Sequence, residues 1–313
     1  MTRPRLGLGT APLANLFNTV TEEAAMATID AAWEMGIRYF DTAPQYGHGL
    51  GEMRLARALA HRQRDEFVLS SKVGRLLQRS GESRPPSAFV DIPDVDPVFD
   101  FSGDGIRKSL EESLVRLGVD RLDVVHLHDP DLHETTALEE SFPALIRLRD
   151  EGLIDRIGCG MNQWQMLTRF VERVPLDCVL LAGRWTLIDR SGQQLLETCS
   201  THGVEVVLGG VFNSGLLADP TGRPTFDYSP ASLEMVKLAS RMAEICTDHG
   251  VTLPAAAVGF AMRQQAVGTV LFGARSPAEI IADVKFAGVN IPDALWEAID
   301  EGLASHREKR RSV

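Results

Sequence analysis

The chain has 313 residues, of which 44% are hydrophobic and 24% charged, a composition typical of a globular protein with a large core. Its formal net charge of −11 argues against a broad binding surface for nucleic acids or anionic membranes. The four cysteines have no metal-binding or paired spacing, no apolar segment approaches the ~18 residues of a membrane span, and no apolar core of a signal peptide follows the N-terminus. We therefore expect a cytoplasmic protein with reduced thiols.

Short aliphatic or β-branched runs alternate with amphipathic helical segments along the chain. Eight runs are predicted as buried strands: residues 6–9, 37–41, 67–71, 122–126, 154–160, 178–182, 204–208 and 269–272. Helices are predicted at residues 22–34, 55–60, 106–117, 141–151, 232–248 and 253–263, with Thr21 capping the first.

Eight strand–helix units with right-handed crossovers imply a parallel sheet that closes into a barrel. We therefore predict an α/β fold, a (β/α)8 TIM barrel that forms one domain over residues 1–313. The main competitor, an open doubly wound sheet, usually carries an early G-x-G-x-x-G, and Gly7-Leu8-Gly9 lacks the third glycine.

Three segments interrupt this rhythm: two loops, and a helix at residues 232–248 that is inserted before the seventh regular helix. Residues 75–102, rich in proline, and residues 209–230, rich in glycine and proline, are predicted as long loops after the third and seventh strands. Both follow carboxyl ends of strands, so we expect them over the mouth of the barrel, where active sites lie. Residues 304–313 form a basic tail that we expect to be solvated.

Polar side chains stand at the predicted carboxyl ends of three strands. Asp41 ends the second strand and is closely followed by Tyr46, Lys72 follows the third, and His128 follows the fourth. A tyrosine with a pKa of ~10 exchanges protons poorly at neutral pH, but a neighbouring ammonium would lower that pKa, and a carboxylate would hold the ammonium. An imidazole could hydrogen-bond the reacting oxygen. These residues predict acid–base catalysis of carbonyl reduction or alcohol oxidation, with hydride supplied by a cofactor.

The sequence around these residues resembles the signature of the aldo-keto reductases. Four segments match this signature and occur in the expected order. They are Phe40-Asp41-Thr42-Ala43-Pro44-Gln45-Tyr46-Gly47, Ser71-Lys72-Val73-Gly74, His128-Asp129-Pro130 and Gly158-Cys159-Gly160-Met161-Asn162. The resemblance implies that Tyr46 is the general acid–base, that Lys72 is its pKa partner and that Asp41 holds Lys72. It also implies that His128 orients the substrate carbonyl.

The resemblance further implies a nicotinamide cofactor. Asn162 would hydrogen-bond its carboxamide, with Gly9 and Thr10 near the same ring. The remaining implied contacts follow later strands and are Ala182, Phe212, Ser214, Gly273, Arg275, Glu279 and Asp283. Ala182 stands where the family usually has a glutamine, and Gly209 stands where a tyrosine usually stacks on the ring, so Trp185 is a candidate to help hold it.

The segment after the eighth strand bears on the choice between NAD and NADP. Gly273 stands where a lysine is usual in the family, and Glu279 stands where an arginine often meets the 2′-phosphate. A carboxylate there would repel a phosphate and could accept a hydrogen bond from a 2′-hydroxyl. Arg275 argues the other way. We expect NAD, with NADP as the alternative.

Asp129 distinguishes this chain from the better-known aldose reductases, which often have a tryptophan after the catalytic histidine. A carboxylate favours a hydroxyl-rich small molecule, with Asp129 and Trp185 as candidate substrate contacts. The segments 181–187 and 209–217 resemble the aldose 1-dehydrogenases (L-fucose, L-galactose and D-threo-aldose dehydrogenases), and pyridoxal dehydrogenases resemble them similarly. We therefore expect oxidation of an aldose to a lactone, with pyridoxal 4-dehydrogenase or general aldehyde reductase activity as alternatives.

Three other chemistries use the same residues differently. His126 and His128 have the H-x-H spacing of metal-dependent barrel hydrolases, but later strand ends offer no further histidine, so His126 is predicted as a satisfied interior residue and no metal is expected. Lys72 could form a Schiff base, which leaves Tyr46 and Asn162 unexplained. The chain could also be a non-catalytic, cofactor-sensing subunit. The glycines after Tyr46 are predicted as turn residues rather than a phosphate loop.

Overall fold

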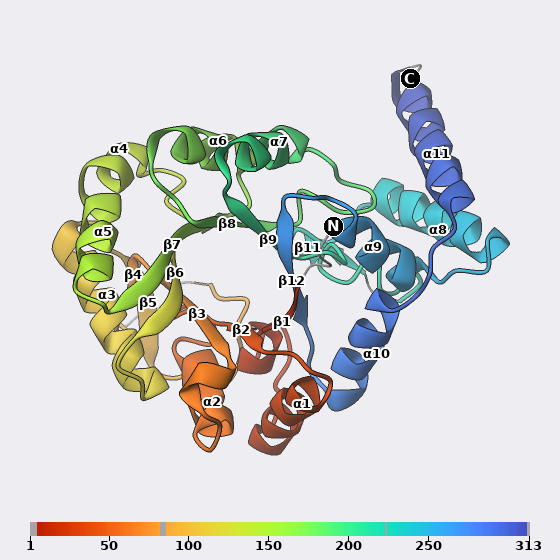
Figure 1. Cartoon of the computed structure of the whole chain (residues 1–313). Coiled ribbons are helices and arrows are strands. Elements are labelled where there is room, and N and C mark those ends of the chain that lie inside the picture. Colours follow the sequence, from red (N-terminus) through yellow and green to blue (C-terminus); the bar gives the residue numbers. More distant parts are fainter. Residues whose placement is uncertain (1–4, 82–85, 223, 312–313) are drawn as a thin grey trace.

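The centre of the molecule is a closed barrel of eight parallel strands (Figure 1). The computed structural model describes residues 5–81, 86–222 and 224–311, with side chains through residue 306. In barrel order the strands are β1 (Arg5–Gly9), β12 (Val267–Gly273), β9 (Glu205–Gly209), β8 (Cys178–Ala182), β7 (Ile154–Met161), β6 (Leu122–His128), β3 (Val68–Val73) and β2 (Tyr39–Asp41). The predicted (β/α)8 barrel is confirmed, and every predicted strand ends within two residues of the observed one.

Helices cover the outside of the barrel, as Figure 1 shows. They are α1 (Glu22–Glu34), α2 (Leu50–Leu59), α3 (Gly103–Leu117), α4 (Glu134–Thr136), α5 (Phe142–Asp150), α6 (Trp164–Arg173), α7 (Gln193–His202), α8 (Leu233–Asp248), α9 (Leu253–Met262), α10 (Pro277–Ala287) and α11 (Asp293–Arg311). Two 3-10 turns (Pro12–Ala14 and Arg64–Glu66) and a π-helical turn (Ala137–Ser141) complete the helical structure. The predicted cap is confirmed, because the Thr21 side chain accepts a hydrogen bond from the N–H of Ala24 (3.2 Å).

Helices α8 and α11 are additions to the eight strand–helix units and pack on each other. Leu238 and Met242 of α8 share a buried apolar cluster with Leu295 and Ile299 of α11. Helix α11 continues to Arg311, so the basic tail is helical through that residue; the side chains from residue 307 onward lie outside the described part. Among the described helices, none has the length and hydropathy needed to cross a membrane.

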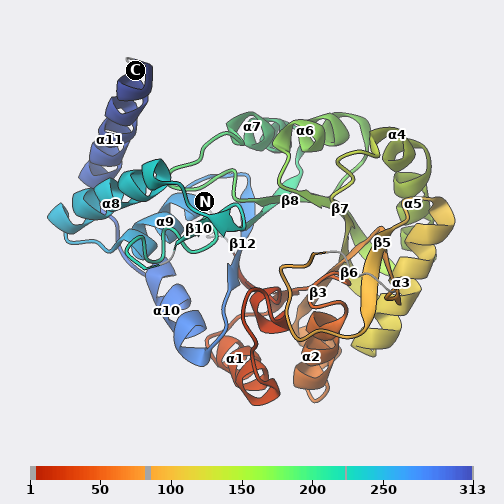
Figure 2. The same cartoon turned by 180° about the vertical axis from the view of Figure 1, so that it is seen from behind.

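The two segments predicted as loops each contain a β-hairpin, so that part of the prediction was wrong. Strands β4 (Arg75–Arg79) and β5 (Val95–Phe99) pair antiparallel within residues 75–102, and β10 (Thr225–Phe226) and β11 (Ser229–Pro230) pair within residues 209–230. Strands β10 and β11 have only two residues each, and both β5 and β11 include a proline, which obscures the strand pattern. Figure 2 views the barrel from the side on which β5 and β10 lie toward the reader.

His126 lies inside the barrel, as predicted, and is fully buried. The expectation that it is satisfied was wrong, because neither ring nitrogen has a hydrogen-bond partner among the described residues. Gly158 on the neighbouring strand makes room for the ring: a Cβ there would lie 2.3 Å from His126 Nδ1. Burial, with Lys72 and Arg156 nearby, lowers the pKa of His126 well below its usual value and keeps the ring neutral.

Candidate active site

A buried ion pair joins the carboxyl ends of β2 and β3. Lys72 Nζ donates to Asp41 Oδ2 at 2.6 Å and to the carbonyl oxygen of Thr42 at 2.8 Å. The second carboxylate oxygen of Asp41 accepts from Ser70 Oγ at 2.9 Å. The side chains of Lys72 and Asp41 are 1% and 2% exposed, so this pair is screened little by solvent. The pairing of Asp41 with Lys72 was predicted from the sequence, whereas the hydrogen bond from Ser70 to Asp41 was not.

Tyr46 lies beside this pair because the chain turns sharply after β2. Lys72 Nζ is 4.5 Å from the centre of the Tyr46 ring. Gly47 and Gly49 have φ values of 59° and 93°, which glycine adopts without strain, as expected for turn residues that position Tyr46. At Gly47 a Cβ would also lie 2.4 Å from the carbonyl oxygen of Ala14. The turn is therefore fixed in both conformation and packing.

Helix α2 begins after this turn and is tied to α3 beneath it. The buried carboxylate of Glu52 accepts from Arg116 Nε at 2.5 Å and from Ser71 Oγ at 2.9 Å. Ser71 immediately precedes Lys72, so these contacts link the turn that carries Tyr46 to the strand that carries its neighbour.

Burial and the neighbouring charges shift the pKa values of these groups. Burial alone would lower the pKa of Lys72, but the negative charge of Asp41 and then that of ionised Tyr46 raise it above its usual value, so the ammonium stays charged. Burial raises the pKa of Tyr46, and this outweighs the lowering by Lys72. Lys72 therefore lowers the pKa of Tyr46, as predicted, but the net pKa stays above its usual value. Tyr46 is accordingly protonated at neutral pH.

His128 ends β6 and faces Tyr46. The two ring centres are 6.1 Å apart with an interplanar angle of 87°. Burial first, and then the charges of Arg75 and Lys72, lower the pKa of His128 well below its usual value. A neutral imidazole can donate a hydrogen bond to a substrate oxygen without carrying charge.

Asp129 extends this side of the mouth and is held by a residue that the sequence did not single out. Arg75, at the start of β4, donates from Nη2 to Asp129 Oδ2 at 2.6 Å, and the same oxygen is 3.5 Å from His128 Nε2. Arg75 Nε is buried and has no hydrogen-bond partner among the described residues. Its partner lies 54 positions away in sequence, so only the fold reveals the pair.

An aromatic side chain from residues 86–92 also reaches Tyr46. The Phe89 ring is 6.2 Å from that of Tyr46 and 6.4 Å from that of His48. Backbone hydrogen bonds from Phe17 to Ala88 (2.8 Å) and from Val90 to Asn15 (3.0 Å) join this segment to the loop after β1. The predicted placement of the 75–102 segment near the site is therefore supported by contacts at Arg75 and Phe89.

The other half of the mouth is built from small residues. Four strands that are neighbours in the barrel, β1, β12, β9 and β8, end in Gly9, Gly273, Gly209 and Ala182. The next strand, β7, leads to Asn162, whose amide donates to the carbonyl oxygen of Ala182 (3.1 Å). A Cβ at Gly9 or Gly209 would meet no atom closer than 3.7 Å. Backbone atoms and the Asn162 side chain therefore line this half, and a flat ligand could lie against the glycines. This surface fits the nicotinamide expected there.

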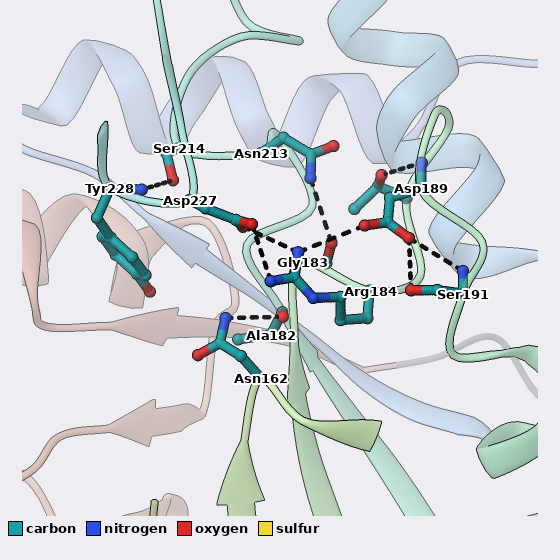
Figure 3. Close-up of polar contacts among 11 residues, drawn as sticks. Asn162, Ala182, Gly183, Arg184, Asp189, Ser191, Asn213, Ser214, Asp227 and Tyr228 are labelled. Atoms are coloured by element: carbon teal, nitrogen blue, oxygen red, sulfur yellow. Dashed lines mark hydrogen bonds and ion pairs between the residues drawn. The ribbon is translucent and has the colours of Figure 1, made fainter. Parts of the chain in front are cut away.

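Thr10, Phe212 and Ser214 lie near this half through different contacts. Thr10 is buried and its hydroxyl donates to Thr42 Oγ1 at 2.8 Å, next to the Asp41 turn. The Phe212 ring stacks on Phe272 of β12, with centres 6.3 Å apart. Ser214 Oγ accepts from the backbone N–H of Tyr228 at 3.2 Å, so it is engaged within its own loop (Figure 3).

The implied cofactor contacts Arg275, Glu279 and Asp283 lie together, between the end of β12 and the first turns of α10. Glu279 accepts from the backbone N–H of Arg275 at 2.8 Å and from its guanidinium at 3.1 Å. Asp283 lies one turn further along α10, and burial together with Glu279 raises its pKa to about 7. The one cation predicted at this position is therefore already paired with a carboxylate.

Trp185 is partly buried and packs against Phe260 of α9, with ring centres 5.2 Å apart. Among the described residues, no hydrogen bond or ring contact joins Trp185 to Asp41, Tyr46, Lys72 or His128, so its contact with a substrate stays a prediction. In the same described ranges, no group of three or more His, Cys, Asp or Glu side chains could hold a metal ion. The hydrolase alternative based on His126 and His128 therefore finds no third ligand there.

Comparison with known proteins agrees with this geometry. The model of the aldo/keto reductase family matches residues 5–304. The chain is 41% identical to a D-threo-aldose 1-dehydrogenase from Pseudomonas sp. over 307 residues, covering 95% of this chain and 93% of that protein. It is 39% identical to a pyridoxal 4-dehydrogenase from Microbacterium luteolum over 328 residues, covering 97% and 96% of the two chains.

Solved structures show the same fold at lower identity. A glycerol dehydrogenase from Gluconobacter oxydans superposes with a TM-score of 0.78 at 24% identity, covering 98% of this chain and 93% of that one. An aldo-keto reductase from Bacillus halodurans gives a TM-score of 0.75 at 23% identity with the same coverage. The chain is therefore a member of the aldo/keto reductase family, an oxidoreductase that uses a nicotinamide cofactor on a small-molecule substrate.

Proposed function

We propose that this enzyme oxidises the anomeric carbon of an aldose to a lactone with NAD. The observation that carries the proposal is the Arg75–Asp129 pair beside His128. A sugar presents hydroxyl groups next to its reacting carbon, and a carboxylate with a guanidinium can accept and donate hydrogen bonds to them. The D-threo-aldose 1-dehydrogenase relative is consistent with this substrate class.

In the proposed mechanism, Tyr46 transfers the proton, and Lys72, Asp41 and His128 assist it. The bound nicotinamide supplies the hydride acceptor for oxidation and the hydride donor for reduction. Ionised Tyr46 takes the proton of the anomeric hydroxyl as the hydride leaves the carbon, so that one hydride and one proton leave the sugar. Lys72 stabilises the phenolate, and Asp41 keeps Lys72 charged and in place. His128 donates a hydrogen bond to the oxygen that becomes the lactone carbonyl.

The other half of the mouth would hold the cofactor. Asn162 would bind the carboxamide, and the small residues Gly9, Ala182 and Gly209 would lie against the ring. The preference for NAD is supported by Glu279, which pairs with the guanidinium of Arg275. A 2′-phosphate would have to displace this carboxylate to reach the guanidinium, whereas a 2′-hydroxyl could donate a hydrogen bond to it.

Pyridoxal is the second candidate substrate. The pyridoxal 4-dehydrogenase from Microbacterium luteolum is nearly as similar to this chain as the sugar dehydrogenase. Pyridoxal forms a cyclic hemiacetal, and its oxidation to a lactone is the same reaction at the same kind of carbon. A non-catalytic sensing role is less favoured, because Asp41, Tyr46, Lys72 and His128 are assembled in contact range.

The test is an absorbance assay for reduced nicotinamide with the purified protein. NAD and NADP are each combined with L-fucose, L-galactose, D-arabinose, pyridoxal and short alcohols, and the reverse reaction is followed with aldehydes. We expect NADH to form with at least one aldose. Turnover of pyridoxal alone would replace the sugar by the second candidate, and no turnover with tight cofactor binding would favour the sensing role.

We also propose that residues 1–313 act as a single domain with the 75–102 and 209–230 segments over its mouth. The contacts of Arg75 and Phe89 with the site support that arrangement for the first segment. All four cysteines are unpaired and buried, which supports the cytoplasmic location expected from the sequence.

A further inference from the structure

The tip of the β10–β11 hairpin holds a tyrosine in an unusual backbone conformation. Phe226 pairs with Ser229, so Asp227 and Tyr228 form the two-residue turn between the strands. Their φ values are 48° and 60°, both in the left-handed region. Two-residue hairpin turns of this kind favour glycine at the second position, and a bulky side chain there is strained. Such strain at an ordered position points to a function for the side chain it displays.

The turn is held in place by contacts to the loop after β8 and to Ser214. The guanidinium of Arg184 donates to both carboxylate oxygens of Asp227, at 2.9 and 2.8 Å (Figure 3). Arg184 also lies 3.4 Å from Asp189, which anchors it to its own loop. The N–H of Tyr228 donates to Ser214 Oγ at 3.2 Å. The two contacts at the turn fix both of its strained residues.

These contacts place the Tyr228 ring at the mouth of the barrel. In Figure 3 the ring points from the turn toward the barrel strands. It packs against Phe17 of the loop after β1, with centres 6.5 Å apart, and the residue remains 53% exposed. Desolvation of the hydroxyl by the surrounding groups, and then the charges of Tyr46 and Asp129, raise the pKa of Tyr228 to about 12. The phenol is therefore neutral, and the residue keeps exposed surface that a ligand could cover.

We propose that Tyr228 determines specificity for ring-shaped substrates by packing against the apolar face of the ring, and that Arg184 and Asp227 are the residues that position it. A pyranose has C–H groups on its faces and hydroxyls around its rim. An aromatic side chain complements the face, while Asp129 and Arg75 serve the rim. This inference rests on the proposed function, and it adds the part of the site that distinguishes a cyclic sugar from an open-chain aldehyde.

The experiment compares Tyr228→Ala, Tyr228→Phe and the control Val115→Ala, which removes an 82% exposed side chain from the outer helix α3. KM and kcat are measured with the best aldose and NAD, and with glycolaldehyde and NADH. We expect Tyr228→Ala to raise KM for the aldose about tenfold while kcat and the constants for glycolaldehyde stay within threefold. Tyr228→Phe keeps the ring and should stay within threefold of wild type, as should Val115→Ala.

The positioning pair is tested with Arg184→Gln and Asp227→Asn, and with Arg241→Gln as the control, which breaks an exposed ion pair on α8. Each variant of the pair should raise KM for the aldose three- to tenfold without lowering kcat, and either change made in Tyr228→Ala should add little. Equal losses with glycolaldehyde, or additive losses in the double variants, would show that the hairpin supports the fold and does not select substrates.

The wild-type data separate this inference from the proposed function. If the enzyme oxidises pyridoxal and no aldose, the aldose proposal fails, and the Tyr228 comparison is made with pyridoxal as the ring substrate. If Tyr228→Ala leaves KM unchanged for every ring substrate that wild type accepts, the inference fails while the proposed function stands. If wild type accepts only open-chain aldehydes, both are overturned.

Discussion

Replacing Lys72 by methionine removes the ammonium from the centre of the site and keeps most of the aliphatic side chain. In the wild type, Nζ contacts Asp41 at 2.6 Å and the carbonyl of Thr42 at 2.8 Å, and the pair is almost fully buried. The variant leaves the Asp41 carboxylate buried with Ser70 as its remaining side-chain partner. We expect both catalysis and stability to fall, for separable reasons.

The expected sizes follow from this geometry. Loss of the group that stabilises the phenolate should lower kcat by about 10²–10⁴-fold, the range typical of general acid–base catalysis. Breaking a buried ion pair from one side typically costs about 3–5 kcal/mol, which corresponds to a fall in Tm of roughly 5–8 °C for a protein of this size. In Lys72→Met/Asp41→Asn no unpaired charge remains, so at least half of the lost Tm should return while kcat stays low.

The pH dependence gives a further check. Burial raises the pKa of Asp41, and Lys72 opposes that rise in the wild type. Without Lys72 the folded-state pKa rises further above the unfolded value of ~4, so the destabilisation grows as pH increases through the folded pKa. The Tm deficit should therefore be larger at pH 8 than at pH 5 by thermal unfolding, with exposed Lys108→Met unchanged as the control. An equal deficit at both pH values, or a double variant no more stable than the single one, would refute the assignment of a buried, functional ion pair.

Three further results are expected. Tyr46→Phe should lower kcat by about 10²–10⁴-fold, while the cofactor Kd measured by fluorescence titration should not change. Because the pKa of Tyr46 is raised, the rate of oxidation by the wild type should increase up to pH 10, and the rate of reduction should stay constant from pH 6 to 9. A plateau of the oxidation rate below pH 8 would contradict the raised pKa. Glu279→Arg should shift kcat/KM toward NADP by about 10–100-fold, as expected for a charge-assisted contact of ~1.5–3 kcal/mol, and Glu244→Arg on α8 should not. Asp129→Ala should raise KM for the aldose by about tenfold and change the aldehyde KM little, since one hydrogen-bonded group is lost; an unchanged aldose KM would remove Asp129 from substrate binding.

The barrel and its acid–base centre were predictable because both depend on local patterns. Buried strands read as aliphatic runs, and Asp41 and Lys72 stand at strand ends that a parallel barrel must bring to one face. Arg75 and Tyr228 were missed because prolines obscure the strand pattern of their hairpins and because their partners are far away in the sequence. The net pKa of Tyr46 was also beyond the sequence, since it depends on how deeply the ring is buried.

The mouth of the barrel is divided between two stretches of chain. Residues 41–129 carry the acid–base groups. Residues 160–283, with the end of β1, carry the small residues, the expected coenzyme contacts and the hairpin that displays Tyr228. The Thr10–Thr42 hydroxyl contact and the hydrogen bond from Asp129 N–H to the Gly160 carbonyl are two of the contacts that join the stretches. Asp129 and Glu279 share no hydrogen-bond or ion-pair partner among the described residues, so changes at these two positions should combine additively, within about 0.5 kcal/mol in transition-state free energy. An engineer could accordingly retune one without repeating the optimisation of the other.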